Sequence, residues 1–319
     1  MKREVRIVIR AQEAGVRIVD ILSHRFTYLD RGQWLDAIAS GDVVLNGCAV
    51  SPETFPAEGD VLEYRFPDIQ EPPVHTDYSI LFEDTDLLAV DKPPHLPCHP
   101  GGRYFNHTLW ALLKKNLNMP HLSFVNRLDR ETSGVVLAAK TSESAARCRA
   151  QFDDRQVFKR YVALVEGAFP EAPVDAAGYM VRDENSQIRK KVKFCRFSGD
   201  ESIPAGAKAC RTHFRNLMTR DGLSMVEAVP ETGRIHQIRA VLSGLGYCMA
   251  GDKIYGVDET IFLRFIGDRL TDGDRQKLRL SRQALHAADL HVLHPKTGIK
   301  LCFHAPVPDD MKQLMRLES

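Results

Sequence analysis

The 319-residue sequence contains no run of 18 consecutive apolar residues, so we expect no membrane-spanning helix. It also contains no Cys-x-x-Cys pair, and its seven cysteines are scattered along the chain. An odd, scattered set of cysteines is typical of the reducing cytoplasm and argues against a disulfide framework. The densest group of metal-ligating residues, His95-x-x-Cys98-His99, has no second ligand pair at a suitable spacing, so we expect no metal.

The first residues do not have the composition of a signal peptide. Val5, Ile7 and Ile9 alternate with other residues, which is the pattern of a β-strand with one buried face. We therefore expect a cytoplasmic protein. The sequence shows no internal repeat of useful period and no low-complexity tract.

Net charge is also nearly absent, with 43 Lys and Arg against 42 Asp and Glu. The charges are nevertheless unevenly distributed. Residues 36–91 contain 13 acidic residues and one arginine, whereas residues 103–160 contain 11 basic and 5 acidic residues, and residues 182–220 contain 10 basic and 4 acidic residues. This asymmetry predicts a basic face, for which a polyanion is the usual partner. Ordinary solvated surface is the alternative interpretation.

Residues 1–66 have the pattern of a small α/β domain. We expect a strand over residues 5–10, followed by helices around residues 16–22 and 34–41. Asn46-Gly47 lies between apolar runs and predicts a β-hairpin. A final strand is expected over residues 61–66.

Residues 67–77, with Pro72-Pro73, are typical of a stiff linker, because consecutive prolines disfavour both helix and central strand. Residues 78–319 then form a larger domain with few helices, one of them predicted by the spacing of leucines over residues 109–117. Short apolar strands dominate, and we expect an α+β domain with a mixed, mainly antiparallel sheet and flanking helices. The expected strands are 78–82, 87–90, 158–166, 192–197, 209–218, 223–229, 285–293 and 299–304.

One string of residues stands out within this domain. Residues 126–134 read Asn-Arg-Leu-Asp-Arg-Glu-Thr-Ser-Gly, so that Asp129 lies between Arg127 and Arg130 just before the apolar run 135–139. A carboxylate framed by cations at the end of a buried strand is a candidate for covalent or electrostatic chemistry. A surface ion pair in a turn is the alternative.

The whole string resembles the signature of the RluA-type pseudouridine synthases, in which the Asp of an Arg-Leu-Asp triplet is catalytic. Three further strings match that family in the same order, and the resemblance spans about residues 78–308. The strings are Lys159 to Gly167, Thr232 to Arg239 followed by Gly251 to Gly256, and Ala284 to Ala287 with His294-Pro295.

The resemblance implies roles for the matching residues. Asp129 is the catalytic carboxylate, and Arg234 is expected to pair with it and keep it ionised. Tyr161 is expected to stack on the uracil and to handle a proton, although a half-buried strand tyrosine is the alternative. Arg127 is expected to fill the gap left when the target base leaves the stack. Ile238 is expected to pack against that base, with an ordinary core position as the alternative.

Two further sets of cations are candidates for RNA contact. Within residues 189–193, Lys190 and Lys191 could line the RNA path, with a solvated β-hairpin as the alternative. Residues 15–65 are similar to the S-four-type RNA-binding domain named after a ribosomal protein, which presents basic residues on two short helices. That resemblance implies RNA contact by Arg17, Arg25 and Arg31.

The chain departs from the RluA-type pattern at two positions. Asn126 stands where the family usually has His, and Val241 stands where a His commonly follows the Gln-Ile-Arg segment. Neither position carries the expected chemistry, so we expect activity to survive while the choice of RNA changes.

The resemblance as a whole implies a cofactor-free, metal-free RNA pseudouridine synthase with an N-terminal RNA-binding domain. We expect a monomer without membrane contact, and we favour ribosomal RNA over transfer RNA as its substrate. A non-catalytic RNA-binding or ribosome-assembly protein that retains the fold is one alternative. A nucleoside or glycoside hydrolase is another, but it would need a second catalytic carboxylate, and Glu131 is too close in sequence to Asp129.

Overall fold

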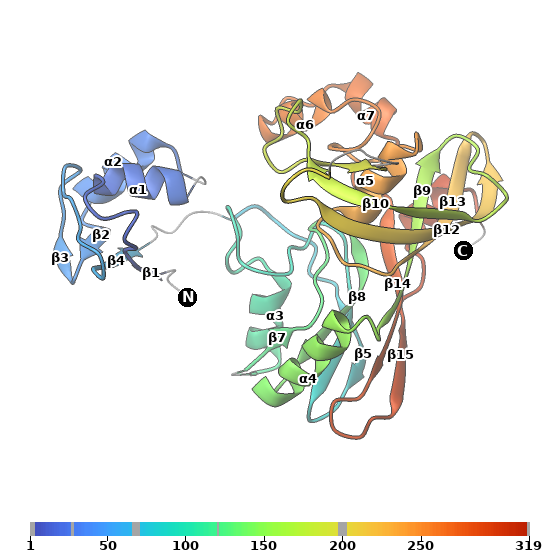
Figure 1. Cartoon of the computed structure of the whole chain (residues 1–319), viewed down its shortest axis with the longest axis horizontal. Coiled ribbons are helices and arrows are strands. Elements are labelled where there is room, and N and C mark those ends of the chain that lie inside the picture. Colours follow the sequence, from blue (N-terminus) through green and yellow to red (C-terminus); the bar gives the residue numbers. More distant parts are fainter. Residues whose placement is uncertain (1–3, 27–28, 66–70, 120, 197–202, 318–319) are drawn as a thin grey trace. The chain divides into compact units, whose positions relative to one another are not determined.

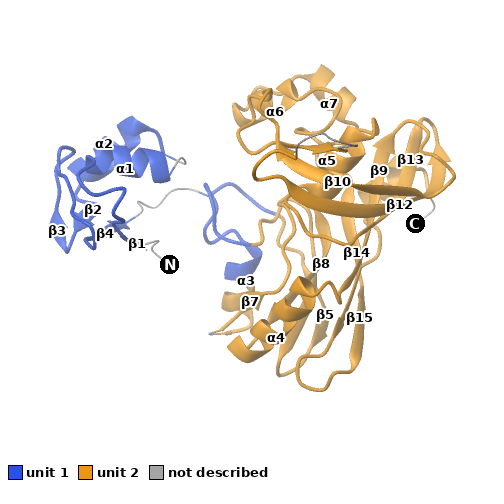
Figure 2. Ribbon diagram, viewed as in Figure 1, with its two compact units in different colours: residues 1–74, 99–112 blue, residues 75–98, 113–319 orange. Residues whose placement is uncertain are grey.

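The computed structural model describes residues 4–26, 29–65, 71–119, 121–196 and 203–317. It contains two compact units (Figure 2). The first consists of residues 1–74 with 99–112, and the second of residues 75–98 with 113–319. The boundary expected after residue 66 lies outside the described residues, and residues 71–77 of the expected linker contain neither helix nor strand. Among the described residues, no helix has the length and apolar character that crossing a bilayer requires.

The N-terminal part of the first unit is a small sheet covered by two helices. Its strands are antiparallel in the order β1-β4-β2-β3, and the hairpin at Asn46-Gly47 joins β2 to β3 as predicted. Trp34 and Tyr64 are buried in its core, with ring centroids 4.7 Å apart. The elements are β1 (Glu4–Val8), α1 (Ile18–Arg25), α2 (Arg31–Ala39), β2 (Val43–Leu45), β3 (Cys48–Ala49) and β4 (Val61–Arg65).

The proline-rich segment is tied to the loop before α3. Glu71 accepts hydrogen bonds from the backbone N–H groups of Phe105, Asn106 and His107 at 2.7 to 2.8 Å. The His107 ring also contacts the Pro72 carbonyl oxygen at 2.7 Å. Residues 71–72 are therefore fixed by polar contacts within the first unit.

The second unit is built on an 11-stranded sheet. Its main path runs β11-β10-β12-β13-β9-β14-β8-β6-β5, with β15 on β14 and β7 on β8. All pairs are antiparallel except β8 with β14. The strands are β5 (Ser79–Glu83), β6 (Leu87–Lys92), β7 (Ser123–Phe124), β8 (Ser133–Ala139), β9 (Phe158–Glu166), β10 (Val174–Arg182), β11 (Val192–Cys195), β12 (Lys208–Arg220), β13 (Leu223–Pro230), β14 (Leu285–Leu293) and β15 (Lys300–His304).

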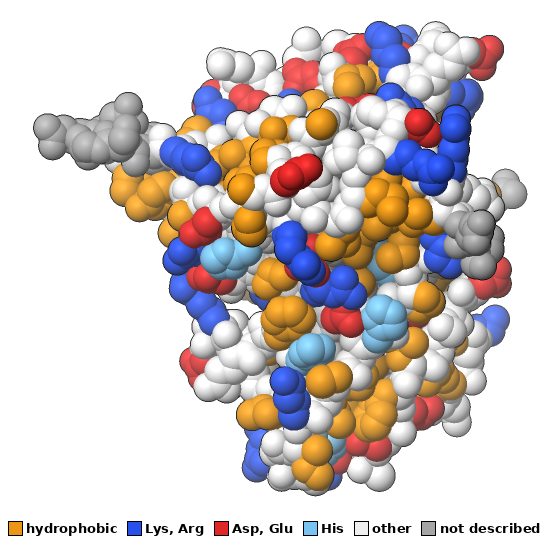
Figure 3. Space-filling model, turned by 90° about the vertical axis from the view of Figure 1, so that its right-hand side faces the viewer, with side chains coloured by type: hydrophobic (Ala, Val, Ile, Leu, Met, Phe, Trp, Pro, Cys, Tyr) orange, Lys and Arg blue, Asp and Glu red, His pale blue; other side chains and the backbone are white. Residues whose placement is uncertain are grey.

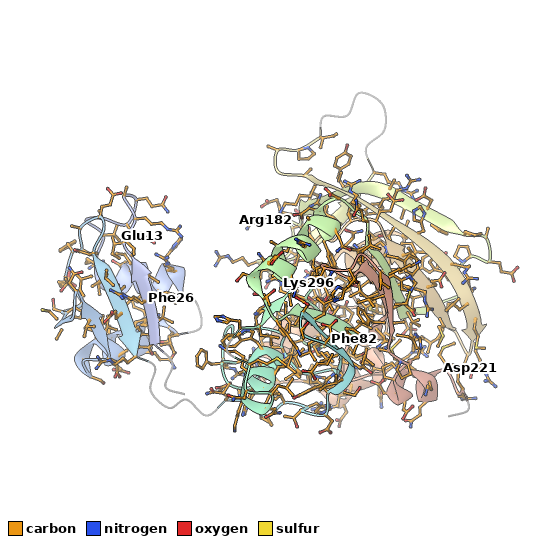
Figure 4. All side chains as sticks on the ribbon, turned by 90° about the horizontal axis from the view of Figure 1, so that it is seen from below. Glu13, Phe26, Phe82, Arg182, Asp221 and Lys296 are labelled. Atoms are coloured by element: carbon orange, nitrogen blue, oxygen red, sulfur yellow. The ribbon has the colours of Figure 1, made fainter. Side chains whose placement is uncertain are left out.

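The remaining helices are short and flank this sheet (Figure 1). Helix α4 packs on β8 and β14, whereas α5 packs on β11 and β12. Buried side chains fill the space between these layers (Figure 4). The expected α+β class with a mainly antiparallel sheet is confirmed. The helices are α3 (Leu109–Asn116), α4 (Ser142–Asp153), α5 (Gln237–Gly244), α6 (Thr260–Ile266), α7 (Asp272–Leu278) and α8 (Asp309–Leu314).

Candidate active site

Asp129 lies on the loop that joins β7 to β8. The amide of Asn126 ties this loop to β8, since it donates to the Val135 carbonyl oxygen at 3.1 Å and accepts from the Leu137 N–H at 2.7 Å. Leu128 is buried, and its N–H donates to the Cys98 sulfur at 3.4 Å. The loop is thus anchored before Asp129, whose side chain remains 36% exposed.

A buried lysine donates hydrogen bonds to this loop and to a neighbouring segment. Lys92 is 0% exposed, and its ammonium donates to the carbonyl oxygens of Pro93, Leu96 and Arg130 at 2.8, 2.9 and 3.3 Å. Because burial penalises its charge, the pKa of Lys92 falls to about 8. Its contacts connect the Asp129 loop to the segment after β6.

Arg239 of α5 is the ion-pair partner of Asp129. Its Nη1 lies 2.9 Å from Asp129 Oδ2, and its side chain is 5% exposed. The predicted pairing of Asp129 with Arg234 is wrong. Arg234 is exposed and precedes α5, and its Nε donates to the Ala209 carbonyl oxygen at 3.2 Å. The helix begins at Gln237, so its register turns the later arginine inward.

Asp252 holds the other side of the Arg239 guanidinium. Its two carboxylate oxygens accept from Nε and Nη2 of Arg239 at 2.6 and 2.8 Å, and one of them also accepts from the N–H groups of Ile254 and Tyr255. A planar guanidinium can serve both carboxylates at once, which an ammonium cannot do with the same geometry. Arg239 therefore joins Asp129 to a fully buried, fixed anion.

The resulting field keeps Asp129 ionised. Burial would raise the pKa of Asp129, but the charge of Arg239, with hydrogen bonds from Gln283 and Arg239, holds its pKa below the ordinary value. Asp129 Oδ2 accepts both hydrogen bonds, and Gln283 Nε2 lies 3.2 Å from it. Among the contacts of the described residues, Oδ1 has no hydrogen-bond partner, so one carboxylate oxygen is available to a substrate.

His236 and Tyr255 form a second layer beside this ion pair. The Nε2 atom of His236 lies 3.9 Å from Asp129 Oδ2, and its Nδ1 lies 3.0 Å from the Tyr255 hydroxyl. The Tyr255 oxygen accepts from the Val192 N–H at 3.2 Å, and its ring faces the Arg239 guanidinium at 5.1 Å. If the phenol donates to Nδ1, the remaining proton of neutral His236 sits on Nε2, toward Asp129. Burial and Arg239 lower the pKa of His236, which favours that neutral form.

The residues after Asp129 make a second buried ion pair. Lys253 Nζ lies 2.8 Å from Glu131 Oε2, also donates to the Ser281 carbonyl oxygen, and lies 4.8 Å from the centre of the Phe265 ring. Gln283 donates from its side chain to Thr132 Oγ1 at 2.7 Å. Glu131 is thus buried and paired, and these contacts connect the Asp129 loop to residues far along the chain.

Tyr161 and Ile238 lie near the core side of the site. Tyr161 is half-buried on β9, and burial together with the negative charge of Asp129 raises its pKa to about 12. Its phenol is therefore protonated at neutral pH. Ile238 is 6% exposed and belongs to the core cluster. Ile235, three residues earlier, is 60% exposed and lies before the helix.

The candidate RNA-contacting cations of this unit differ in their availability. Arg127 and Lys190 are exposed, and Lys190 is close enough to affect the titration of His236. Lys191 is only 16% exposed, and its ammonium lies 2.5 Å from Glu259 and 3.9 Å from Asp183. The prediction that Lys191 lines an RNA path is therefore not supported by its geometry, because acidic partners already neutralise its charge.

The three arginines of the small domain are also paired. Arg17 Nε lies 2.8 Å from Asp20, and Arg25 Nη1 lies 3.0 Å from Glu13. Arg31 pairs with the same Asp20 carboxylate. Such surface pairs remain breakable in water, but they reduce the positive field of these helices.

The two departures from the family pattern have structural explanations. Asn126 uses its amide to extend the hydrogen bonding of β8, and Val241 is fully buried in the core cluster. Their predicted influence on the choice of RNA is not supported by these positions, since Val241 is fully buried and the Asn126 amide is occupied by β8.

One group of described residues has the spacing of metal ligands, namely Asp84, Asp86 and His294. Its members already have partners, since His294 Nε2 lies 2.9 Å from Asp84 Oδ2 and Lys296 Nζ lies 2.9 Å from Asp86 Oδ1. The group therefore joins the ends of two hairpins, and we assign no metal to it.

Comparisons with known proteins identify the family of the chain. A family model described as RNA pseudouridylate synthase matches residues 86–244. The ribosomal large subunit pseudouridine synthase D of Xylella fastidiosa is 33% identical over 311 residues, covering 95% of this chain and 88% of that protein. The mitochondrial tRNA pseudouridine(32) synthase of Saccharomyces cerevisiae is 34% identical over 243 residues, covering 76% of this chain and 51% of that protein.

A solved structure shares the fold. The human RNA pseudouridylate synthase domain containing 4 has a TM-score of 0.59 and 24% sequence identity, covering 75% of this chain and 94% of that chain. Similarity to the bacterial and yeast enzymes extends over most of this chain, including Asp129, Arg239 and the strands between them. The chain therefore belongs to the RluA-type family of RNA pseudouridine synthases, which are isomerases.

Proposed function

We propose that this enzyme isomerises uridine to pseudouridine in ribosomal RNA of the large subunit, with Asp129 as its catalytic carboxylate. The name of the Xylella relative supports that substrate, although the yeast relative is named for transfer RNA. The observation that carries the catalytic assignment is the state of Asp129. Its pKa is held below the ordinary value, Arg239 contacts one of its carboxylate oxygens, and its side chain is 36% exposed.

The reaction requires a group of this kind. The bond from the ribose to nitrogen N1 of uracil breaks, the freed base rotates, and a new bond forms from the ribose to carbon C5. A carboxylate can attack the sugar, attack the base, or stabilise a transient sugar intermediate. Each route needs an anion at the start, and the contacts with Arg239 and Gln283 supply that condition.

Tyr161 is proposed to hold the base and to move a proton. Its phenol stays protonated at neutral pH, because its pKa is raised to about 12. The aromatic ring offers a flat surface for the uracil. Isomerisation also requires that the proton on C5 be removed after the new bond forms. The Tyr161 hydroxyl is the proposed relay, which accepts the C5 proton as it passes its own to the N1 side of the base, where the product carries a proton.

Arg127 is proposed to stabilise the flipped state of the RNA. A base in a duplex or stacked loop must leave its neighbours to reach Asp129, which costs a few kcal/mol. Arg127 is exposed two residues before Asp129, and its planar guanidinium can stack where the base has left. Ile238 is proposed to limit the depth to which the base enters.

The small domain is proposed to contact RNA in addition to the catalytic unit. Because Arg17, Arg25 and Arg31 are each paired with a carboxylate, we assign most of the electrostatic attraction to exposed cations of the catalytic unit. Lys190, which is exposed and lowers the pKa of His236, is one of the proposed contacts.

The proposal is tested by release of tritium from RNA labelled at C5 of uridine. We expect Asp129→Asn to abolish release. The Kd for RNA should change less than about threefold, because the amide has the shape of the carboxylate and many other contacts bind the RNA. Asp221→Asn, in the exposed turn between β12 and β13, is the matched control and should retain wild-type activity. Measurable turnover by Asp129→Asn would refute the catalytic assignment.

The RNA target needs a separate measurement. Pseudouridine mapping across total RNA from cells with and without the gene should show a lost modification in large-subunit ribosomal RNA. Loss confined to transfer RNA would contradict the proposed substrate and leave the catalytic assignment standing.

A further inference from the structure

A shallow groove lies on the large unit outside the loop of Asp129. Its volume is about 610 Å³, and it is formed where β10, β12 and the end of β11 meet the turn after β13. Small side chains form much of its lining, including Ala177 and Ala209. The groove is open to solvent, and the backbone at Gly178 is closely packed, since a Cβ there would lie 2.5 Å from the Phe194 ring.

The lining is rich in arginine. Arg155, Arg196 and Arg211 line the groove, against the single carboxylate of Glu231. Arg211 is engaged by Asp175, with Nε at 3.0 Å from Oδ1. The other two arginines are exposed. The guanidinium of Arg196 contacts the Asp175 carbonyl oxygen at 3.3 Å and the Phe194 ring. The guanidinium of Arg155 has no polar partner among the contacts of the described residues.

Two more cations adjoin these arginines. Lys159 Nζ lies 3.4 Å from the carbonyl oxygen of Thr232, which lines the groove. Arg234 Nε contacts the carbonyl oxygen of Ala209, another lining residue. Five cations thus lie at the groove against the carboxylates of Asp175 and Glu231, and this excess favours an anionic ligand. On the face shown in Figure 3, basic and acidic side chains lie close to one another.

The groove also contains an aromatic ring. Tyr179 is half-buried on β10 and lines it. Arginines along a groove with an aromatic ring are the combination by which proteins bind single-stranded nucleic acid, since phosphates meet the cations and a base stacks on the ring. A duplex presents no free base faces, so the ring favours an unpaired strand.

The lining segments continue directly into the active site. Thr232 donates to the Gln237 side chain at 2.7 Å, and Gln237 begins the helix that carries Arg239. Lys159 lies two residues before Tyr161 on β9. A strand of RNA in the groove would thus lie beside two segments of the chain, one that continues to Arg239 and one that continues to Tyr161.

We propose that this groove binds the single-stranded RNA segment next to the target uridine. Arg155 and Arg196 contact its phosphates, and Tyr179 stacks on one of its bases. The inference rests on the proposed function, because it names the part of the same RNA substrate that lies outside the catalytic pocket. It also explains why exposed arginines gather around a groove that holds no catalytic residue.

The double variant Arg155→Ala/Arg196→Ala tests the phosphate contacts. Binding of a single-stranded oligouridine of about 16 nucleotides is measured as a function of salt. Each phosphate contact contributes about 0.7 to the slope of log K against log salt for a single strand, so losing two contacts should reduce the slope by about 1.4. At 0.1 M salt, binding should then be roughly 25-fold weaker. The KM for tritium release should rise similarly, while kcat stays unchanged.

Arg220→Ala is the matched control. It removes an exposed arginine from the far end of β12, nine residues from Arg211 and so about 30 Å along the strand. It should keep the wild-type slope and KM. For the ring, Tyr179→Phe should bind as the wild type does, and Tyr179→Leu should bind about tenfold more weakly.

Two outcomes would overturn the proposal. One is an unchanged slope and KM in the double variant, and the other is a fall in kcat with KM unchanged.

Binding is also measured in the Asp129→Asn background, which separates the two proposals. A changed slope without any pseudouridine formation by the wild type would reject the proposed function and keep the groove, whereas activity with an unchanged slope would reject the groove alone.

Discussion

At the scale of single residues, Arg239 determines what Asp129 can do. A carboxylate in this partly buried position would otherwise become neutral more readily, because burial raises its pKa. Arg239 prevents this, and Asp252 in turn holds the guanidinium in place through two hydrogen bonds. Asp129, Arg239 and Asp252 are electrostatically coupled, so a change in any one of them shifts the pKa values of the other two.

Arg239→Lys should therefore change both stability and pH dependence. A lysine keeps the charge but cannot make the three directed contacts, so the free energy of unfolding should fall by about 2–3 kcal/mol. Because the pKa of Asp129 is lowered in the folded protein, its ionised form stabilises the fold above the ordinary carboxyl pKa, and that contribution is lost as pH falls through the lowered value. Weakening Arg239 raises this pKa and moves the acid limb of kcat/KM to higher pH.

The measurements are urea unfolding and a pH profile of tritium release. Arg234→Lys is the control, since Arg234 is exposed and contacts a backbone carbonyl oxygen. It should leave the acid limb where the wild type has it. A shift caused by Arg234→Lys and absent in Arg239→Lys would contradict the assignment of Arg239 as partner.

At the scale of elements, the pairing of β8 with β14 positions the site. This is the parallel pair of the sheet, and it joins Ser133 to His286 and Gly134 to Ala287. Strand β8 begins four residues after Asp129, and β14 begins two residues after Gln283. The distance between these strands therefore sets the distance between Asp129 and the amide that contacts it.

Gly134→Ala should disturb this pairing. Gly134 has a φ of +111°, and a Cβ there would lie 2.2 Å from the Ala287 carbonyl oxygen, so the strands must separate. We expect a loss of about 3 kcal/mol or more in the free energy of unfolding, with reduced kcat. Gly222→Ala is the control, since Gly222 has a φ of +75° and open space around it, and should cost about 1 kcal/mol. Equal losses in the two variants, by urea unfolding, would refute the steric explanation.

At the scale of the whole molecule, the chain contains units with separate cores. The small domain buries its own cluster around Trp34, whereas the large unit has two further clusters. Separate cores allow separate unfolding, because each unit loses its apolar burial independently. A domain of about 60 residues has a small core and is expected to have only a few kcal/mol of stability.

The isolated fragment 1–66 should therefore fold cooperatively but weakly. Trp34 is 0% exposed and serves as its probe, since the fragment contains no other tryptophan. In the whole chain carrying Trp110→Phe, Trp34 fluorescence should change at lower urea than the circular dichroism of the large sheet. A single coincident transition, or a fragment without any cooperative transition, would contradict separate units.

Local pattern was sufficient to predict most of the elements. Strands β9 and β14 have the predicted bounds, and the hairpin at Asn46-Gly47 forms as expected, since alternation and turn residues act between near neighbours. Helix α4 was not predicted. Its buried residues are Ser144, Ala145, Cys148 and Gln151, and Phe152 is the one large apolar residue that it packs against the core, so its period is not visible in the sequence. Strand β10 was missed as well.

The sequence by itself determined the family, the position of Asp129 and the order of the strands that surround it. Only the tertiary structure decided which arginine pairs with that carboxylate. Both Arg234 and Arg239 lie in one string, but the start of α5 turns Arg239 toward Asp129, 110 positions earlier in the chain. Gln283 reaches the same carboxylate across 154 positions. Such contacts depend on how distant strands pack, and spacing along the chain does not specify them.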